Sequence, residues 1–324
     1  MYLKTEEALN FVNSEILMKD LLLNCSNWGK CETYMTKYGL RVEIDDNSQQ
    51  NGSSGTFHFN YKINSKLHEG KNSIVFLGED KIRGFKAAIK RVQFKNCEHL
   101  KTYLTGGIPD EVFVQTQAEK VAFENVSIKI VKLLDWYVYD NYFIIVTEYD
   151  DKFDDLYDSA NNQDDEHFSE KECKTIFKML FKTVDILNQN GIFHLDLKPS
   201  NIIYNIRDKK LKIIDFGHST CTYAGQNLLV NYSCGTKGLI TPQQVEKTNC
   251  FGKDVDLWGV AQTIYFCLQG NYAFDNDLEV LNKKLQFKVK VSEECKDLIT
   301  RMLVHKVEYR MTPYEIINHP WLKV

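Results

Sequence analysis

The stretch HLDLKPSN (194–201) places an acid, a base and an amide in eight positions. Asp196 and Lys198 are two residues apart, Asn201 follows three residues later, and a further carboxylate, Asp215, comes at the end of an apolar run. Groups of these types can transfer protons and neutralise charge, but they also occur in ordinary polar turns. The elements that hold them in place decide between the two interpretations.

A long helix is predicted immediately before this stretch. Ser169-Glu-Lys-Glu172 has the spelling of a capping box, and Gly191 follows the last periodic residue. The apolar residues on one face between these ends are Ile176, Phe177, Leu180, Phe181, Val184 and Leu187. The turn that carries Asp196 therefore follows an amphipathic helix.

The region from about Phe57 to 150 is rich in strand-forming residues. Its β-branched and aromatic runs are YKINSKL, SIVFLGED, FKAAIKRVQF, IVKLLDWYVY and YFIIVTEY. One helix interrupts them, from Pro109-Asp110-Glu111 to about Glu124, with proline in its first turn and acids near the positive end of its dipole. After residue 150 the pattern is mainly helical. The sequence thus predicts an α+β chain with a strand-rich small lobe before a helical large lobe.

The N-terminal part of the sequence predicts a helix followed by a linker. Residues 5–23 place Leu9, Val12, Ile16 and Leu17 at helical spacing, which predicts an amphipathic helix. The polar run DDNSQQNGSSG indicates a linker. We therefore expect an N-terminal helical extension at 1–44 and a flexible linker at 45–56. The apolar face of the helix must be buried, against the small lobe, another protein or a second copy in a homodimer.

Composition narrows the choice of partners and compartment. The 324 residues carry 40 Lys+Arg against 44 Asp+Glu, a formal charge of −4, which argues against nucleic acid as a partner. No apolar run approaches the ~20 residues that span a bilayer, so no membrane is expected. Nine cysteines without a C-x-x-C pair indicate reduced thiols. We expect an intracellular protein, cytoplasmic and/or nuclear.

Three motifs, in this order along the chain, resemble those of eukaryotic protein kinases. AAIK (87–90) is similar to the family's third-strand lysine motif, HLDLKPSN to its catalytic loop and LKIIDFG (211–217) to its metal-binding loop. The resemblance covers roughly residues 57–324. It implies a bilobal kinase fold, with an antiparallel-sheet N-lobe containing one helix at 57–149 and a mainly helical C-lobe at 150–324.

The resemblance also assigns roles to these residues. Phosphoryl transfer requires positioning and charge neutralisation more than covalent chemistry. By the resemblance, Lys90 would hold the α- and β-phosphates of ATP, and Asn201 and Asp215 would ligate Mg²⁺. Asp196 would accept the proton of the substrate hydroxyl, and Lys198 would steady the transferred phosphate.

Two glutamates on one predicted helix could pair with the lysine. Glu119 is followed one turn later by the apolar Phe123, where the family usually places an apolar residue, whereas Glu111 would put the polar Gln115 there. We therefore expect Glu119 to be the catalytic partner of Lys90. This assignment implies an insertion around CEHLKTYLTGG between the lysine and the helix.

The nucleotide-binding residues follow from the same resemblance. Of the family's glycine-rich loop only the middle glycine remains, in His68-Glu-Gly70-Lys-Asn-Ser73-Ile-Val75, which puts nucleotide affinity in question. By the resemblance, Thr147 would stand at the gate of the back pocket, and the backbone from Glu148 to Tyr149 would meet adenine. The complete predicted set is Leu67, Gly70, Val75, Ala88, Lys90, Thr147, Glu148, Tyr149 and Ile203.

The activation segment departs from the family pattern at two places. Leu195 stands where most members have the arginine that pairs with a loop phosphate, so we expect activity without that phosphate. GTKGLITPQ resembles the serine/threonine signature and places Thr236 near Lys198, but Gln243 replaces a glutamate, so its partner Arg310 would receive only a hydrogen bond. Two further segments match the family, DVDLWGVA, whose Asp256 braces the catalytic loop, and the C-terminal HPWL.

Eight acids and one base, Lys152, occupy residues 150–166. Such a run is often simply solvated, but beside a peptide groove it favours basic substrates. The subfamily resemblances disagree: VKLLDWY and DDLYD look like Pim and PAS-domain kinases of the calmodulin-kinase-like branch, whereas HLDLKPSN with DFGHST is similar to Wee and Myt kinases.

The motifs together predict ATP- and Mg²⁺-dependent transfer of the γ-phosphate to serine or threonine of protein substrates. The missing glycines, Leu195 and Gln243 leave an alternative, a pseudokinase that acts as a scaffold or nucleotide-binding switch. A third interpretation, a small-molecule kinase on the same fold, is weakened by Lys198 with Thr236 and by the full-length helical lobe.

Overall fold

The computed structural model describes residues 56–95, 99–100, 102–105, 108–226, 228–230, 236 and 238–323. They form two units, described here in turn: 56–116 with Lys132–Asp150, and Gln117–Val131 with 151–323. The predicted N-terminal helical extension, its possible role in a homodimer and nearly all of the predicted linker lie outside the described residues.

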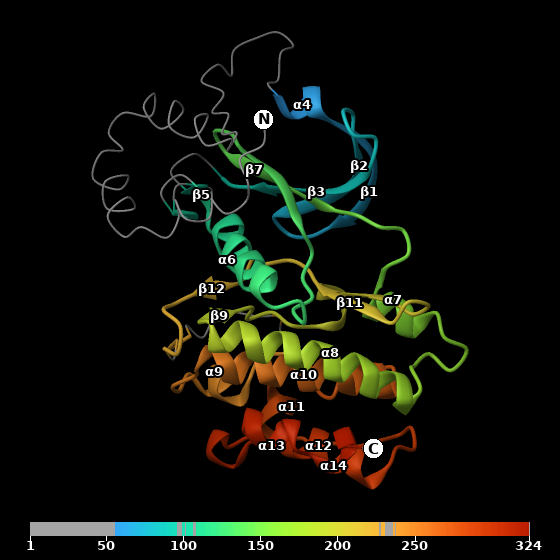
Figure 1. The fold of residues 1–324 in the computed structure, drawn as a ribbon. Coiled ribbons are helices and arrows are strands. Elements are labelled where there is room, and N and C mark those ends of the chain that lie inside the picture. The colour runs from blue at the N-terminus through green and yellow to red at the C-terminus, as the bar shows by residue number, and fades with distance from the viewer. Residues whose placement is uncertain are drawn as a thin grey trace. The chain divides into compact units, whose positions relative to one another are not determined.

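The first unit is built on a five-stranded antiparallel sheet, ordered β1-β2-β3-β7-β6 (Figure 1). Its strands are β1 (Tyr61–Glu69), β2 (Ser73–Asp80), β3 (Lys86–Gln93), β6 (Leu133–Val138) and β7 (Tyr142–Glu148). Its other elements are α4 (Thr56–Asn60), the short pair β4 (Leu104–Thr105) and β5 (Ile108–Pro109), and the first turns of α6 (Asp110–Glu124).

Along β3, β6 and β7 both faces of this sheet are apolar, because these strands alternate two sets of buried side chains, whereas β1 is exposed after Tyr61. One cluster contains Phe57, Tyr61, Ala87, Ile89, Tyr137, Tyr139, Ile144 and Val146. We call the second the α6-side cluster; it contains Phe94, Leu100, Val112, Trp136, Val138, Phe143 and Ile145. The sequence predicted strands from about Phe57, but Phe57 lies in the helix α4. Its side chain is 1% exposed and packs against the rings of Tyr61 and Tyr137.

The boundary between the units falls inside α6, after Thr116, and not only at residue 150. The chain that follows α6 is bound into the second unit by its backbone: Val131 N donates to Ile213 O at 2.9 Å, and Ile213 N donates to Lys129 O at 2.9 Å. These hydrogen bonds join segments about eighty residues apart in the sequence, so local pattern does not reveal them.

The second unit is mainly helical. Its longer helices are α8 (Glu170–Gln189), α10 (Gly252–Gln269) and α12 (Glu293–Met302). The shorter ones are α7 (Leu156–Asn161), η1 (Pro199–Asn201), α9 (Pro242–Glu246), α11 (Asp277–Asn282), η2 (Val307–Tyr309), α13 (Pro313–Ile317) and α14 (Pro320–Lys323). Its strands are β8 (Asp154–Asp155), β9 (Ile192–Phe193), β10 (Ile202–Asn205), β11 (Lys210–Ile213) and β12 (Thr220–Cys221).

The predicted ends of α8 are observed, with one difference. Ser169 caps the helix by accepting a hydrogen bond from Glu172 N at 3.2 Å. The Glu172 carboxylate, however, accepts from Tyr204 and Lys209. At the other end Gly191 has φ +74, and a Cβ there would lie 2.5 Å from Thr222 O, so glycine is required.

Helix α10 is buried along almost its whole length, and its own apolar side chains point in all directions around the helix axis. Against it pack α8 and α12, and the three helices bring together the buried thiols of Cys173, Cys267 and Cys295, each 0% exposed. Burial raises the pKa of all three thiols, that of Cys295 to about 12.

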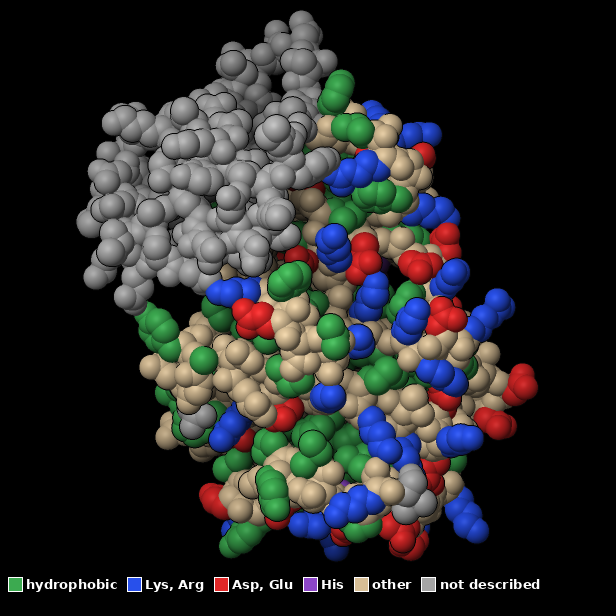
Figure 2. All heavy atoms as spheres, in the orientation of Figure 1, with side chains coloured by type: hydrophobic (Ala, Val, Ile, Leu, Met, Phe, Trp, Pro, Cys, Tyr) green, Lys and Arg blue, Asp and Glu red, His purple; other side chains and the backbone are tan. Residues whose placement is uncertain are grey.

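The described surface carries charged side chains of both signs. On the face drawn in Figure 2, basic and acidic side chains are interspersed over the described part of the chain. Among the described residues, no helix is long and apolar enough to cross a membrane.

Glu170 joins three helices and provides a test of this unit's stability. It lies at the start of α8 and accepts hydrogen bonds from Ser292 N at 2.7 Å and from Trp321 Nε1 at 2.8 Å. Burial alone would raise its pKa, but bonds from Ser292 and Trp321, with the charge of Lys174, lower it below its usual value.

Replacing Glu170 with glutamine is expected to lower the free energy of unfolding at pH 7 by about 1–2 kcal/mol. A lowered carboxylate pKa contributes stability above the ordinary value of about 4.3, and this contribution is lost as pH falls through the folded-state pKa. The difference between the two proteins should therefore shrink below about pH 4.3. Urea unfolding at a series of pH values measures it, with the exposed Glu294→Gln as control; equal losses in both variants would contradict the role of Glu170.

Candidate active site

One buried carboxylate holds the backbone of the segment HLDLKPSN in place. Asp256, on α10, accepts hydrogen bonds from His194 N at 3.0 Å, Leu195 N at 2.7 Å and Asn188 Nδ2 at 2.8 Å. Burial raises its pKa, and the charge of His194 and these three donors partly offset that effect. Leu195 has φ +64, an unfavourable conformation for a leucine, so the bonds to Asp256 keep a strained turn in place.

A glycine lets the loop approach α10 closely. A Cβ at Gly259 would lie 2.8 Å from both Leu197 Cβ and Leu197 O, closer than atoms can pack. The backbone on either side of Asp196 is therefore positioned against a rigid, buried helix.

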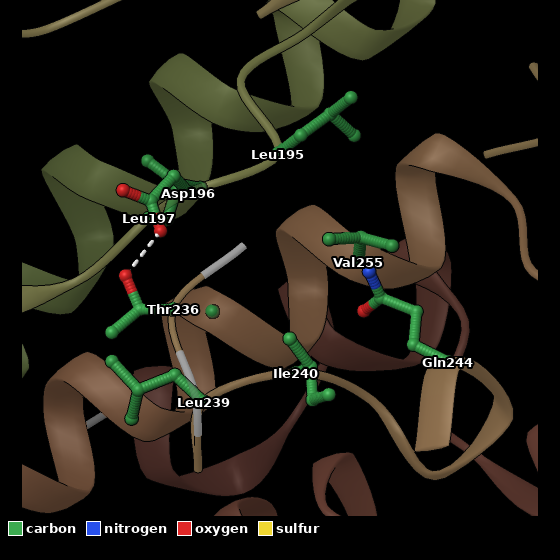
Figure 3. A pocket seen from close by; sticks show the side chains of 9 residues that line it. Leu195, Asp196, Leu197, Thr236, Leu239, Ile240, Gln244 and Val255 are labelled. Carbon is green, nitrogen blue, oxygen red and sulfur yellow. Dashed lines mark hydrogen bonds between the residues drawn. The ribbon is translucent and has the colours of Figure 1, made fainter. Parts of the chain in front are cut away.

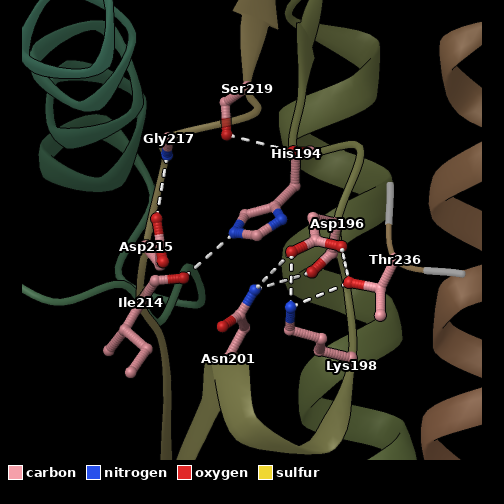
Figure 4. A network of polar contacts seen from close by, with 9 residues as sticks. All are labelled: His194, Asp196, Lys198, Asn201, Ile214, Asp215, Gly217, Ser219 and Thr236. Carbon is pink, nitrogen blue, oxygen red and sulfur yellow. Dashed lines mark hydrogen bonds and ion pairs between the residues drawn. The ribbon is translucent and has the colours of Figure 1, made fainter. Parts of the chain in front are cut away.

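The carboxylate of Asp196 is the centre of a polar network (Figure 4). Lys198 Nζ lies 2.8 Å from Asp196 Oδ2, and Thr236 Oγ1 donates to Asp196 Oδ1 at 2.7 Å. Lys198 Nζ also donates to Thr236 Oγ1 at 2.9 Å, while Asn201 Nδ2 donates to Asp196 O at 2.8 Å and to Oδ2 at 3.2 Å. Asp196 is only 7% exposed, so its orientation is fixed by these partners.

Asp215 is attached to the same segment through the backbone. Ile214 N donates to Asn201 O at 2.9 Å, and the His194 ring nitrogen Nε2 lies 3.0 Å from Ile214 O. Asp215 itself has φ +62, and its Oδ1 accepts from Gly217 N at 3.0 Å. The turn therefore positions this carboxylate next to the network around Asp196.

Asn201 and Asp215 have the chemistry that a magnesium ion requires. The amide nitrogen of Asn201 is bonded to Asp196, which leaves its Oδ1 as the atom presented to a ligand. Carboxylate and amide oxygens are hard donors of the kind that Mg²⁺ prefers. The residues present thus fit this metal.

Lys90 forms its ion pair with Glu111, and the prediction of Glu119 was wrong. Lys90 Nζ lies 2.7 Å from Glu111 Oε1 and 2.9 Å from Oε2. The pair is largely shielded from water, with the side chains 17% and 8% exposed.

The geometry of α6 explains the error. Its buried stripe runs through Glu111, Val114, Gln115 and Ala118 at helical spacing. Glu119 is eight residues after Glu111, so it lies about 12 Å farther along the axis and about 80° around it. Phe123, the residue that favoured Glu119, is 76% exposed, whereas the polar Gln115 is 2% exposed.

The predicted phosphate-covering loop is a tight hairpin between β1 and β2. Gly70 N donates to Ser73 O at 2.8 Å, and His68 pairs with Val75. A Cβ at Gly70 would lie 3.3 Å from Ser73 Oγ, so a side chain here would require a small shift of the serine. Leu67 lies on β1 and is 44% exposed.

The remaining predicted nucleotide residues of the first unit lie side by side on the sheet. Ala88 pairs with Thr147 across β3 and β7, and Val75 pairs with Lys90 across β2 and β3. Glu148 N donates to Lys132 O at 2.9 Å, and Lys132 N donates to Glu148 Oε1 at 2.8 Å, so Lys132 fixes the strand end that leads to Tyr149. Ile203 lies in the second unit, on β10.

Leu195 is buried in an apolar cluster where the family pattern would have a cation. We call it the Leu195 cluster; it contains Phe193, Leu195, Val230, Cys250 and Val255, with Leu228 packed against it. A backbone ladder accompanies it, because Val230 N donates to Cys250 O at 2.8 Å and Gly252 N donates to Leu228 O at 2.9 Å. The described part of the activation segment is therefore fastened by apolar packing and backbone hydrogen bonds.

The segment that follows Thr236 lines a small cavity next to the loop (Figure 3). Leu239 and Ile240 face it together with Leu195 and Val255. Farther on, Gln243 Oε1 accepts from Arg310 Nη2 at 3.0 Å, so the expected replacement of an ion pair by a hydrogen bond is confirmed. Arg310 also lies over the Trp258 ring, 4.9 Å from its centroid.

One supporting residue was missed by the sequence reasoning. Asn188, near the end of α8, donates to Asp256 at 2.8 Å and to Ile192 O at 3.1 Å, and so links α8, α10 and β9. An asparagine near a helix end usually indicates a cap, so its type alone did not predict this role.

Comparison with known proteins defines the class. The family model for the protein kinase domain matches residues 61–322, and the chain therefore belongs to the protein kinase family. The kinase PK-1 of Cydia pomonella granulovirus has a similar fold, with a TM-score of 0.67 and 24% identity over 83% of this chain and 96% of that one. The predicted α+β class, with an antiparallel-sheet lobe and a helical lobe, is confirmed.

Two curated relatives are similar in sequence. Serine/threonine-protein kinase prk-2 of Caenorhabditis elegans is 28% identical over 88% of this chain, and PSK2 of Saccharomyces cerevisiae is 31% identical over 68% of it. The matches span 63% of the worm protein and 19% of the yeast protein. The finer resemblances to Pim, PAS-domain, Wee or Myt kinases stay predictions.

Proposed function

We propose that this chain transfers the γ-phosphate of ATP to serine or threonine hydroxyls of protein substrates. The single observation that carries the proposal is the network around Asp196, in which Lys198, Asn201 and Thr236 all contact one buried carboxylate. A scaffold that only bound nucleotide would not require a carboxylate oriented by three neighbours.

The chain's own residues would act by position and charge. Asp196 would accept the proton of an incoming hydroxyl, and Lys198 would neutralise charge beside it. Asn201 and Asp215 would hold Mg²⁺, which supplies charge neutralisation at the phosphates when bound. Lys90, oriented by Glu111, would hold the α- and β-phosphates, and the predicted set from Leu67 to Tyr149, with Ile203, would bind the rest of ATP.

The test is transfer of labelled phosphate from ATP by the purified chain, to itself and to a basic serine peptide. We expect incorporation with Mg²⁺ and none when EDTA removes the metal. No incorporation together with a nucleotide-induced rise in Tm would instead support the alternative, a nucleotide-binding scaffold.

We further propose a preference for basic substrates. Asp158 lies exposed on α7, and α7 packs against η1, the end of the catalytic loop. Asp151, Asp154, Asp164, Asp165 and Glu166 are also exposed. Asp155 is used differently, because its carboxylate caps α7 by accepting from Asp158 N at 2.9 Å, and burial raises its pKa.

Peptides with and without arginine before the serine test this preference. Asp158→Asn is expected to lower the ratio of their kcat/KM values by about twofold to fivefold, the range of an exposed ion pair. Asp208→Asn, an exposed acid between β10 and β11, is the matched control. A wild-type ratio near one would refute the preference.

We also propose that activity does not depend on a phosphate in the activation segment. Leu195 is 3% exposed and offers no donor to a phosphate, and the Leu195 cluster with its backbone ladder fastens the segment instead. Phosphatase treatment, followed by mass-spectrometric mapping, is expected to leave the rate unchanged. A large gain in rate that follows phosphate on residues 215–242 would overturn the proposal.

The two glutamates of α6 can be distinguished by activity. Glu111→Gln is expected to lower kcat/KM by about 10²-fold, because Lys90 loses the carboxylate that orients it and misplacement of about 1 Å has effects of that size. Glu119→Gln, the same chemical change on the same helix, is the control and should retain the wild-type rate. Steady-state kinetics with the basic peptide measures both variants. A large loss of activity in Glu119→Gln with a wild-type rate in Glu111→Gln would restore Glu119 as the partner of Lys90.

A further inference from the structure

The connection between β3 and α6 contributes buried side chains to the α6-side cluster. We define the β3–α6 connection as the described residues between β3 and α6, which are 94–95, 99–100, 102–105 and 108–109. Phe94 is 8% exposed and Leu100 is 2% exposed, and Leu104 and Ile108 pack against the same cluster from β4 and β5. The cluster receives Val112 from α6 on the other side. The connection thus lies between the sheet and the first turn of the helix as part of the core.

Backbone hydrogen bonds hold the connection at both ends. Phe94 N donates to Asn141 O at 2.7 Å, in the turn between β6 and β7. At the other end, Asp110 N, the first residue of α6, donates to Tyr103 O at 2.9 Å. Between them Tyr103 N donates to Leu100 O at 2.9 Å, so the residue that bonds to the helix also bonds to the buried leucine.

This packing controls the rotation of α6. Val112 and Glu111 are successive residues, about 100° apart around the helix axis. Val112 is 2% exposed in the α6-side cluster, while Glu111 faces Lys90. Because they share one rigid helix, Glu111 cannot turn away from Lys90 unless Val112 leaves the space that Leu100 and Phe94 help to form.

We propose that the β3–α6 connection is a built-in positioning element that keeps Glu111 on Lys90, with Leu100 as its principal side chain. The ion pair then needs no second protein to form it. The proposal deepens the proposed function and rests on it for its kinetic consequence, but its structural consequence can be measured separately.

The experiment compares Leu100→Ala with Leu134→Ala in the full chain. Leu134→Ala is the control, because it removes the same atoms from a partly buried leucine of β6 that packs on the opposite face of the sheet, against the cluster that contains no residue of α6. Leu100→Met, which keeps the volume, should retain wild-type behaviour. Thermal unfolding first confirms that each variant is folded at the temperature of the assays.

The structural readout is hydrogen exchange of the α6 amides within residues 110–116. We expect about tenfold faster exchange there in Leu100→Ala, with exchange in α10 unchanged, and no selective effect in Leu134→Ala. Equal effects of the two alanine variants, or no effect of Leu100→Ala on α6, would overturn the proposal and assign Leu100 to stability alone.

The kinetic readout is the division between kcat and KM. Leu100→Ala is expected to lower kcat by about 10²-fold with the KM for the peptide unchanged, as expected when a group that orients the lysine is misplaced. If the wild type transfers no phosphate, the proposed function fails, while the exchange experiment still decides whether the connection positions α6. Faster exchange in α6 with an undiminished kcat would overturn the functional half of the proposal.

Discussion

Asp196→Asn is expected to lower phosphate transfer between about 10²-fold and 10⁴-fold, the usual contribution of a positioned general base. The amide has nearly the same shape and can still accept from Lys198 or Thr236, so the loop should keep its conformation. What it loses is the negative charge that takes up the proton. Transfer of labelled phosphate to the basic peptide measures the loss.

Two controls separate chemistry from folding in this experiment. The rise in Tm caused by Mg²⁺ and ATP should persist in Asp196→Asn, because Asp215 and Lys90 are unchanged and Asn201 keeps its hydrogen bond to the backbone oxygen of residue 196. Asp208→Asn removes the same charge from an exposed turn of the same unit and should transfer phosphate at the wild-type rate. Equal rates for wild type and Asp196→Asn would show that another group takes the proton.

Asp256→Ala is expected to lower the free energy of unfolding by about 3–5 kcal/mol and to abolish most transfer activity. The carboxylate is 1% exposed, and its removal leaves two buried N–H groups, those of His194 and Leu195, without their acceptor. The strained conformation at Leu195, φ +64, is then no longer held, so the loop that carries Asp196 should relax.

Urea unfolding and peptide kinetics measure the two effects of Asp256→Ala. Asp185→Ala is a suitable comparison, since Asp185 lies on α8, accepts a hydrogen bond from Gln189 at 2.8 Å and is partly exposed. A loss for Asp256→Ala no larger than that for Asp185→Ala would show that the loop is supported by packing rather than by the carboxylate.

Regular elements were predictable because their side-chain pattern is local. SIVFLGED corresponds to β2 residue for residue, and the helix expected from Pro109-Asp110-Glu111 to about Glu124 is α6, Asp110–Glu124. Alternating and helical periodicities follow directly from which faces of these elements are buried. By contrast β4 and β5 have two residues each, too few to show a period, and exist because Leu104 pairs with Pro109 beside a core made of distant strands.

In the candidate site too, the residues set by local spacing were predictable, and those set by tertiary packing were not. Asp196, Lys198, Asn201 and Thr236 were expected near one another from motif spelling, and the first three lie on one short loop where sequence spacing determines distance. The choice between Glu111 and Glu119 depends instead on the rotation of α6, which Val112 and the β3–α6 connection determine through contacts with Trp136 and Phe143. A single helix sequence contains no information about that external packing.

The three buried thiols of the helical unit allow its opening to be timed. Cys173, Cys267 and Cys295 lie on three different long helices, are 0% exposed and have pKa values raised by burial, so neither access nor ionisation favours their alkylation in the native state. A thiol reagent therefore labels all three together only in molecules whose helices have separated. The labelling rate, read peptide by peptide in a mass spectrometer, would follow cooperative unfolding of this unit without denaturant or an added probe.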